Sequence, residues 1–338
     1  MKNKKALITG ITGMVGSHLA DYLLEATDWD IYGILRWRSP LDNISELLGK
    51  INDRKRIFLL YADLRDTLSI EKAISEALPD YVFHLAAQSY PKTSFDAPLD
   101  TLDTNIQGTL RVLEAIKKHV PNAKVHVCSS SEVYGRVTKD KLPINEECNF
   151  HPASPYAISK VGTDLVGRYY AEAFGLCVMT TRMFTHTGPR RGDVFAESTF
   201  AKQIAMIECG LIEPIVKVGN LNSLRTIADV RDAVKAYYML LTINPQAGES
   251  YNIGGDYTCT VGRILEYLIS LSIVKNIKVE VDSERLRLID ADLQIPDPKK
   301  FINHTGWKPE IPFEKTMIDL LEYWRKRVRV EGAKFLTR

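Results

Sequence analysis

The sequence predicts an α/β protein in which a doubly wound parallel sheet is followed by a smaller lobe. Short apolar runs alternate with amphipathic stretches from the first residues onward, and the runs are continuous instead of alternating with polar residues. Continuous apolar strands are typical of a parallel sheet that helices cover on both faces. After about residue 184 this alternation ends, and loops rich in proline, glycine and arginine follow. This change of pattern indicates the second lobe.

Six strands are expected in the first part of the chain, at residues 6–9, 31–35, 57–61, 81–85, 125–128 and 176–183. Helical patterns lie between them, such as Val15, Leu19, Leu23 and Leu24, which are spaced to cover one helix face. We expect residues 1–184 to form the sheet domain, completed by about residues 226–255. Residues 185–338 are expected to form mainly the smaller lobe.

Composition limits the classes of function. The 338 residues include 44 basic and 42 acidic side chains, for a formal charge of +2, so nucleic acid is not an expected partner. The five cysteines are odd in number and never occur as C-x-x-C, which favours a reducing compartment and argues against a metal site. The first apolar run ends at Thr9 and Gly10, and no later run reaches transmembrane length. We therefore expect a cytoplasmic enzyme with no membrane partner.

A glycine-rich loop lies between the first predicted strand and the first predicted helix. Its glycines, Gly10, Gly13 and Gly16, have the spacing G-x-x-G-x-x-G, and Thr12, Met14 and Val15 stand between them. Glycines here let the backbone approach a pyrophosphate, and the free N–H groups of the helix start bind its charge. The position at a strand–helix junction favours a dinucleotide site in the Rossmann arrangement over an ordinary tight turn.

The end of the second strand bears on the choice of dinucleotide. An NAD site usually has an acidic residue there, whereas this chain has Arg36 and Arg38. A guanidinium can donate paired hydrogen bonds to a 2′-phosphate, so we favour NADP and leave NAD open. Asp63 and Leu64, after the third strand, are placed where an adenine amino group would bind.

Tyr156 and Lys160 form a Y-x-x-x-K pair on a predicted helix. Four-residue spacing puts both side chains on one helix face, where an ammonium can lower the pKa of the phenol and make it an acid/base catalyst. A serine cluster with an acidic residue, Ser130-Ser131-Glu132, follows the fifth strand. The pair, the serine cluster and the glycine loop together indicate a nicotinamide-dependent enzyme.

With these motifs the chain resembles the extended short-chain dehydrogenase/reductase family, which includes NAD-dependent epimerases and dehydratases. The resemblance covers nearly the whole length, through GITGMVG, DLRD, HLAAQS, TNIQGT, SSSEVYG, SPYAISK and TGWKP. Within that family the chain looks most like the GDP-mannose 4,6-dehydratases, on the segments RWRSPLDNI, TGPRRGDVFAESTFAKQI and VGNLNSLRTIADVRDAV. The resemblance implies a homodimer or homotetramer.

The resemblance also implies roles for single residues. It places catalysis on Ser130, Ser131, Glu132, Tyr156 and Lys160. It adds Leu85, Ala86, Ala87 and Gln88 to the cofactor site, and it assigns to the nucleotide-sugar the residues Ser89, Thr185, Lys202, Val218, Asn220, Arg225, Arg287 and Asp290. The chain departs from the family pattern at Thr185, where an asparagine is usual, at Met14-Val15 and at Ser130. These departures leave the sugar open among a hexose, an N-acetylhexosamine and a heptose.

The implied reaction is 4,6-dehydration of a GDP-sugar to its 4-keto-6-deoxy product. Tyr156 takes the proton of the C4 hydroxyl, Ser130 hydrogen-bonds the forming ketone, and Glu132 serves as base at C5 and as proton donor to the water leaving C6. A 4-epimerase does not need this carboxylate, so Glu132 favours dehydration, although a purely structural role for it stays open. The alternatives are a GDP-4-keto-6-deoxysugar reductase, a nucleotide-sugar epimerase and, more remotely, a non-catalytic NADP-binding sensor.

Overall fold

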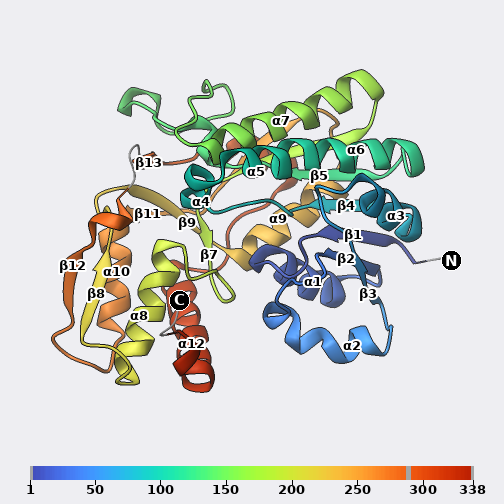
Figure 1. Cartoon of the computed structure of the whole chain (residues 1–338). Helices are drawn as coiled ribbons and strands as arrows, with labels where there is room; N and C mark the ends of the chain where they lie inside the picture. The colour runs from blue at the N-terminus through green and yellow to red at the C-terminus, as the bar shows by residue number, and fades with distance from the viewer. Residues whose placement is uncertain (1–2, 287–290, 336–338) are drawn as a thin grey trace.

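The computed structural model describes residues 3–286 and 291–335, which form a sheet domain and a smaller lobe beside it (Figure 1). The sheet has seven parallel strands in the order β3-β2-β1-β4-β5-β6-β10. They are β1 (Lys5–Thr9), β2 (Asp30–Leu35), β3 (Ile57–Tyr61), β4 (Tyr81–His84), β5 (Lys124–Cys128), β6 (Cys177–Met183) and β10 (Ser250–Ile253). The predicted doubly wound parallel sheet is thus confirmed, with each expected strand within one residue of its observed bounds.

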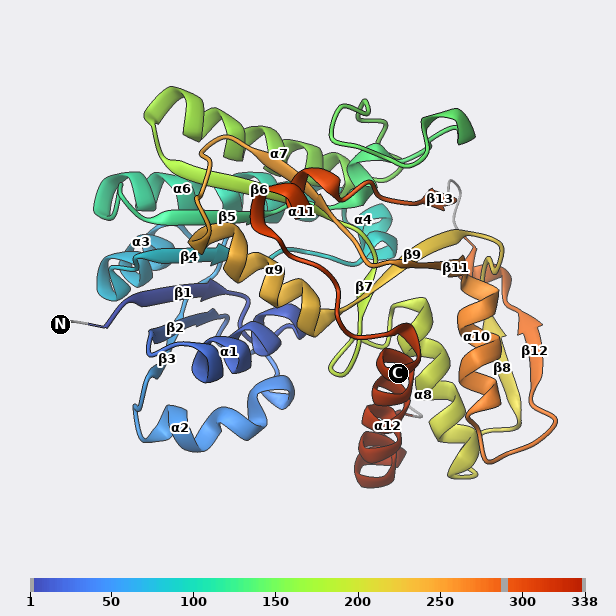
Figure 2. The same cartoon turned by 180° about the vertical axis from the view of Figure 1, so that it is seen from behind.

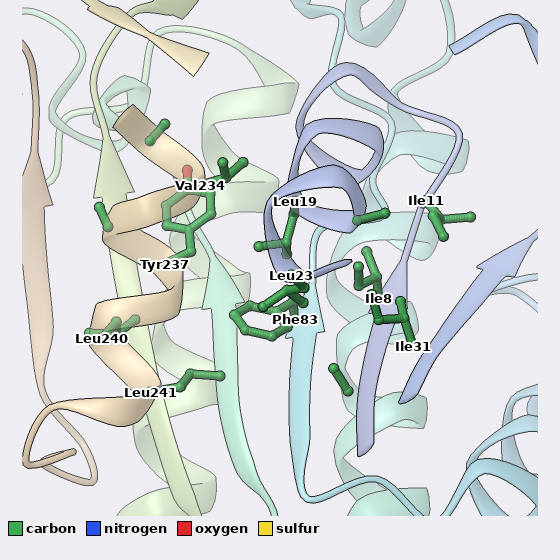
Figure 3. Close-up of a cluster of buried hydrophobic side chains, with 14 of the residues drawn as sticks. Ile8, Ile11, Leu19, Leu23, Ile31, Phe83, Val234, Tyr237, Leu240 and Leu241 are labelled. Carbon is green, nitrogen blue, oxygen red and sulfur yellow. The ribbon is translucent and has the colours of Figure 1, made fainter. Parts of the chain in front are cut away.

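Helices cover both faces of this sheet, as its continuous apolar strands require. One face carries α3 (Thr67–Ala77), α6 (Gly108–His119) and α7 (Pro155–Phe174), and the other carries α1 (Met14–Ala26) and α9 (Val230–Thr242). Figure 3 shows Leu19 and Leu23 of α1 beside Phe83 of β4, and Leu240 on α9 belongs to the same buried cluster. All four of these side chains are fully buried.

The long helix α7 carries the predicted Y-x-x-x-K pair, and local chemistry fixes where it begins. The Ser154 hydroxyl accepts a hydrogen bond from the Ala157 N–H, which caps the helix. Pro155 occupies the first helical position, where a missing N–H costs nothing. Tyr156 and Lys160 therefore lie in the first turns of α7, at the carboxyl edge of the sheet.

The smaller lobe contains short strands and three main helices, at one side of the sheet domain (Figure 2). The helices are α8 (Ala196–Glu208), α10 (Val261–Ser270) and α12 (Phe313–Glu331). β8 (Ile215–Val218) pairs with β12 (Lys278–Val281), and β9 (Leu224–Asp229) pairs with β11 (Tyr257–Thr260), β13 (Leu293–Gln294) and β7 (His186–Thr187). Strands after residue 184 are therefore short but more numerous than the sequence indicated.

The remaining elements connect these parts. They are η1 (Asp42–Leu47), α2 (Leu48–Asn52), α4 (Pro91–Asp96), α5 (Pro98–Leu102), a π turn (Asp103–Gln107) that joins α5 to α6, η3 (Ser131–Tyr134), η4 (Lys139–Lys141), η5 (Ser283–Arg285), α11 (Lys299–Thr305) and η6 (Gly332–Phe335). In the described ranges, no helix has both the length and the apolar character needed to cross a membrane.

The strand order reverses between β1 and β4, which are adjacent although the chain passes through β2 and β3 between them. In open α/β sheets, ligands bind at the carboxyl ends of the strands at this switch point. The smaller lobe lies over that edge, so the two parts of the chain enclose a space between them.

Candidate active site

A cavity of about 1230 Å³ lies at the carboxyl edge of the sheet and extends into the smaller lobe. It brings together most of the residues that the sequence placed in the site. They are Gly10, Gly13, Met14, Val15, Gly16, Arg36, Leu85, Ala87, Ser89, Ser130, Ser131, Glu132, Tyr156, Lys160, Thr185, Val218, Asn220 and Arg225. Residues from the sheet domain and from the smaller lobe thus line one shared cavity.

Other predicted residues do not line this cavity. They are Thr12, Arg38, Asp63, Leu64, Ala86, Gln88 and Lys202. The Asp63 carboxylate accepts hydrogen bonds from Arg65, which lower the pKa of Asp63, and the Lys202 ammonium lies 2.9 Å from an Asp193 carboxylate oxygen. Arg287 and Asp290 lie outside the described residues.

The glycine loop has the geometry of a phosphate cradle. Gly10 has a φ of +75°, a left-handed conformation that favours glycine. A Cβ atom on Gly16 would lie 2.3 Å from the Gly10 carbonyl oxygen, so no side chain fits there. The Thr9 hydroxyl accepts hydrogen bonds of 3.0 Å from the N–H groups of Leu85 and Ala86, which hold the loop after β4 beside the glycine loop. The N-terminus of α1, with Met14 and Val15, therefore lines the cavity beside the glycines.

The segment after β2 covers the glycine loop from outside. Arg36 lines the cavity, while Arg38 is exposed to solvent. The side-chain amide of Asn43 donates a 3.0 Å hydrogen bond to the Thr12 carbonyl, which fixes this segment against the loop. Asn43 also lines the cavity, and the sequence did not indicate it.

Tyr156 and Lys160 both lie in the cavity wall and are almost completely buried. The Lys160 ammonium donates a 2.7 Å hydrogen bond to the Cys128 carbonyl and lies 6.0 Å from the centre of the Tyr156 ring. Burial raises the pKa of Tyr156 above its ordinary value, whereas a hydrogen bond from Ser130 and the charge of Arg191 act in the opposite direction. The pKa of Tyr156 is therefore raised, whereas the lysine alone was expected to lower it, because desolvation of the phenolate dominates.

The serine cluster is built on the short 3-10 turn after β5. The Ser130 hydroxyl accepts a 3.2 Å hydrogen bond from the Glu132 N–H, which caps this turn. The Ser129 hydroxyl donates to the Lys160 carbonyl, so the turn is tied to α7. Ser130, Ser131 and Glu132 therefore face the same space as Tyr156, and the Glu132 side chain is half-buried.

The loop before α8 supplies residues that sequence reasoning did not single out. Arg190 lies 2.5 Å from an Asp21 carboxylate oxygen on α1. Arg191 lines the cavity, and its Nε lies 3.2 Å from Oε1 of Glu197, in the first turn of α8. Both arginines lie in the segment TGPRRGDVFAESTFAKQI, whose resemblance to the family is the signal that could have indicated them.

The opposite end of the cavity is polar and rich in basic side chains. The Arg225 guanidinium donates hydrogen bonds to the carbonyls of Leu224 and Ala291, at 2.9 and 2.8 Å, and so joins β9 to the chain before β13. The Asn220 amide donates to the Ser223 hydroxyl. Arg285 also lines this end of the cavity, although the sequence had indicated Arg287.

Comparison with known proteins identifies a family to which this chain is similar. Residues 7–320 match the family model described as GDP-mannose 4,6 dehydratase. The chain is 33% identical to the GDP-mannose 4,6-dehydratase of Yersinia enterocolitica, over 94% of this chain and 93% of that protein. It is 32% identical to the GDP-6-deoxy-D-mannose reductase of Pseudomonas aeruginosa, over 97% and 99%. Among solved structures it is similar to RMD from Pseudomonas aeruginosa complexed with NADPH, with 30% identity, a TM-score of 0.82 and coverage of 96% and 100%.

Proposed function

The chain belongs to the GDP-mannose 4,6-dehydratase family, and from this premise we propose that it dehydrates a GDP-linked sugar across C5 and C6. The product is the 4-keto-6-deoxy form of a GDP-hexose, a GDP-N-acetylhexosamine or a GDP-heptose. The observation that carries the proposal is that a carboxylate, Glu132, lies in the same cavity wall as Ser130 and Tyr156. Elimination of water needs a base and an acid beyond those required for oxidation at C4.

A nicotinamide dinucleotide fits the first part of the cavity. The tight glycine loop, in which Gly16 packs against the Gly10 carbonyl, the N-terminus of α1 and Arg36 in the cavity wall together suit a pyrophosphate and a 2′-phosphate. The relative of known structure that binds NADPH supports the same choice. When bound, this cofactor supplies a hydride acceptor for C4 and a hydride donor for C6.

The protein side chains supply the proton transfers. Tyr156 removes the proton from the C4 hydroxyl, and the Lys160 ammonium, held by the Cys128 carbonyl, provides positive charge behind it. The Ser130 hydroxyl donates a hydrogen bond to the ketone oxygen, which makes the C5 hydrogen more acidic. Glu132 takes the C5 proton and delivers a proton to the C6 hydroxyl, so that water leaves. Protons and electrons balance because C6 regains the hydride lost at C4 and C5 regains one proton, equivalent to the one that Tyr156 took from the C4 hydroxyl, so one water is lost overall.

The far end of the cavity suits the diphosphate and the base. Arg225 and Arg285 line this end together with Asn220 and Val218, and Asp282, 3.2 Å from Arg285, lines it as well. Guanidinium groups bind phosphate oxygens with paired hydrogen bonds. Relatives named for GDP-linked substrates favour guanosine as the base.

The experiment that tests the function is incubation of the protein and NADP⁺ with GDP-, UDP-, dTDP- and CDP-sugars, followed by mass spectrometry. Loss of one water from a GDP-sugar with catalytic NADP⁺ supports the proposal. A second candidate, reduction of a 4-keto-6-deoxy GDP-sugar, is favoured by the 32% identity to a reductase. In a second incubation, with NADPH and a 4-keto-6-deoxy GDP-sugar, stoichiometric consumption of NADPH would establish the reductase instead.

We also propose that the protein forms a homodimer through α5 and α7. Ile158, Leu165 and Tyr169 of α7 are 50%, 39% and 55% exposed and recur at helical spacing, so they form one apolar stripe. Leu99 of α5, which packs beside α7, is 80% exposed. An apolar stripe on a long surface helix is suited to two-fold pairing with a second copy of itself.

A further inference from the structure

The two-stranded sheet of the smaller lobe has one open edge. β12 lies at the outer side of this lobe, beyond β8 (Figures 1 and 2). Within residues 3–286 and 291–335, no third strand pairs with either of them. The edge on β8 is closed, because the side-chain amide of Gln203 accepts a 2.9 Å hydrogen bond from the Lys217 N–H and donates one of 3.1 Å to the Lys217 carbonyl. Only the β12 edge of this sheet can therefore take a further strand.

The backbone groups of β12 alternate between β8 and the open edge. The Lys278 N–H donates a 2.8 Å hydrogen bond to the Pro214 carbonyl, at the start of the parallel pairing with β8. Because successive residues of a strand point their backbone groups to opposite sides, the N–H and carbonyl groups of Val279 and Val281 point to the open edge. Such a row of groups is a template for pairing with another strand.

The valines of β12 continue the core face of this sheet. Val279 and Val281 are the register partners of Val216 and Val218 on β8, and partners in a sheet point to the same face. Val216 and Val218 are fully buried in the core of the smaller lobe, whereas Val279 and Val281 are 44% and 68% exposed. The apolar face thus reaches the edge of the sheet without being covered there, and a neighbouring strand with valines on the same face would cover it.

The charges of β12 select the strand that fits. Lys278 and Glu280 alternate with the two valines, and charged side chains on an edge usually discourage pairing. An antiparallel second copy of β12 centred on Val279, however, sets each Lys278 opposite a Glu280. Moving the centre by one residue sets two Lys278 or two Glu280 side chains against each other, and centring on Val281 sets Glu280 against Asp282. Of the registers centred within β12, only the one on Val279 has opposite charges and no like charges face to face.

We propose that β12 pairs with β12 of a second copy of this chain, antiparallel and around a two-fold axis through Val279. The two sheets then form one sheet of four strands, and the exposed valines cover one another across the axis. This interface is separate from the one on α7, which lies in the sheet domain (Figure 1), so both can be used at once. A four-residue strand makes a small interface, and we expect a Kd of about 0.1–1 mM, so that the α7 dimer prevails at micromolar concentration.

Covalent capture tests the register. In the proposed pairing, Val279→Cys places two thiols on residues whose Cα atoms are about 5.5 Å apart, within the range of a disulfide. In a glutathione redox buffer at about 0.1 mM protein, we expect this variant to give a disulfide-linked pair of chains on a non-reducing gel, above the background of the wild type. Val281→Cys is the matched control, because Val281 lies on the same face and is more exposed, but its two copies would be more than about 13 Å apart.

Charge reversal tests the choice of partner. In the Val279→Cys background, Lys278→Glu sets glutamates against glutamates and should slow the crosslinking about fivefold or more. Adding Glu280→Lys restores opposite charges and should restore the rate. Lys275→Glu makes the same change of charge at an exposed position outside β12 and should have no effect. Crosslinking of Val281→Cys as fast as that of Val279→Cys, no crosslinking by either, or no response to the two charge reversals would overturn the inference.

Discussion

Replacing Glu132 by glutamine separates elimination from the first oxidation. Glutamine keeps the size of the side chain. The backbone N–H of residue 132, which donates a hydrogen bond to the Ser130 hydroxyl, is unchanged. The amide of glutamine, however, cannot take a proton from C5. Oxidation at C4 requires only Tyr156, Lys160 and a bound cofactor. We therefore expect Glu132→Gln to oxidise the sugar and to stall at the 4-keto stage.

The magnitude follows from the role of one acid/base group. Loss of such a group costs about a hundred- to ten-thousandfold in rate, or about 3–5 kcal/mol of activation free energy. The change in folding stability should be much smaller, within about 0.5 kcal/mol. Glu132 is only half-buried, and in residues 3–286 and 291–335 no ion pair to it is seen, so the substitution leaves no buried cation without its partner.

The assay measures solvent-deuterium incorporation at C5 together with release of water, on the best GDP-sugar, for wild type and Glu132→Gln. Glu147→Gln is the control, since Glu147 is exposed and does not line the cavity. It should behave as wild type. A Glu132→Gln protein that loses water at close to the wild-type rate would make Glu132 structural and would move the reductase ahead of the dehydratase.

Three further predictions concern the cofactor and the assembly. The wild type should bind NADP⁺ more tightly than NAD⁺ in fluorescence titrations, and replacing Arg36 and Arg38 by alanine should narrow that preference; tighter binding of NAD⁺ by the wild type would contradict the assignment. Gly16→Ala should weaken NADP⁺ binding about tenfold or more, because its Cβ would meet a backbone oxygen at 2.3 Å, and unchanged binding would show that the loop is not the phosphate site. Light scattering at micromolar concentration should give a dimer for the wild type and a monomer for Tyr169→Glu, and a monomeric wild type would exclude the α7 interface.

The site residues that were predicted from their spacing lie close together along the chain. Gly10, Gly13 and Gly16 lie on one strand–helix junction, and Tyr156 and Lys160 lie one helical turn apart. Spacing along the chain is enough to place such residues together, because the strand and the helix each have a fixed geometry. The parallel sheet with helices on both faces also followed from the pattern, because continuous apolar strands are typical of strands buried on both sides.

The parts that the sequence did not predict depend on contacts between distant segments. Arg190 meets Asp21 across 169 positions, and no periodicity in either segment indicates the other. Lys202 was assigned to the substrate by resemblance, yet its ammonium lies beside Asp193 and outside the cavity lining. A long charged side chain can point in several directions, on a loop as at Arg190 or on a helix as at Lys202, and only the folded chain decides which of them faces the cavity.

Ion pairs between the smaller lobe and the sheet domain also bear on how tightly the cofactor is retained. Arg327 of α12 lies 3.2 Å from Asp42, in the segment that covers the glycine loop, and Arg190 joins the loop before α8 to Asp21 on α1. Each such surface pair contributes only about 0–1 kcal/mol, so together they favour a closed arrangement without locking it. A dehydratase restores its cofactor in every turnover and gains nothing from releasing it, whereas a reductase must exchange the cofactor each time. We therefore expect a dehydratase to retain its cofactor through purification more fully than a reductase, and the fraction of purified protein that carries cofactor measures this difference.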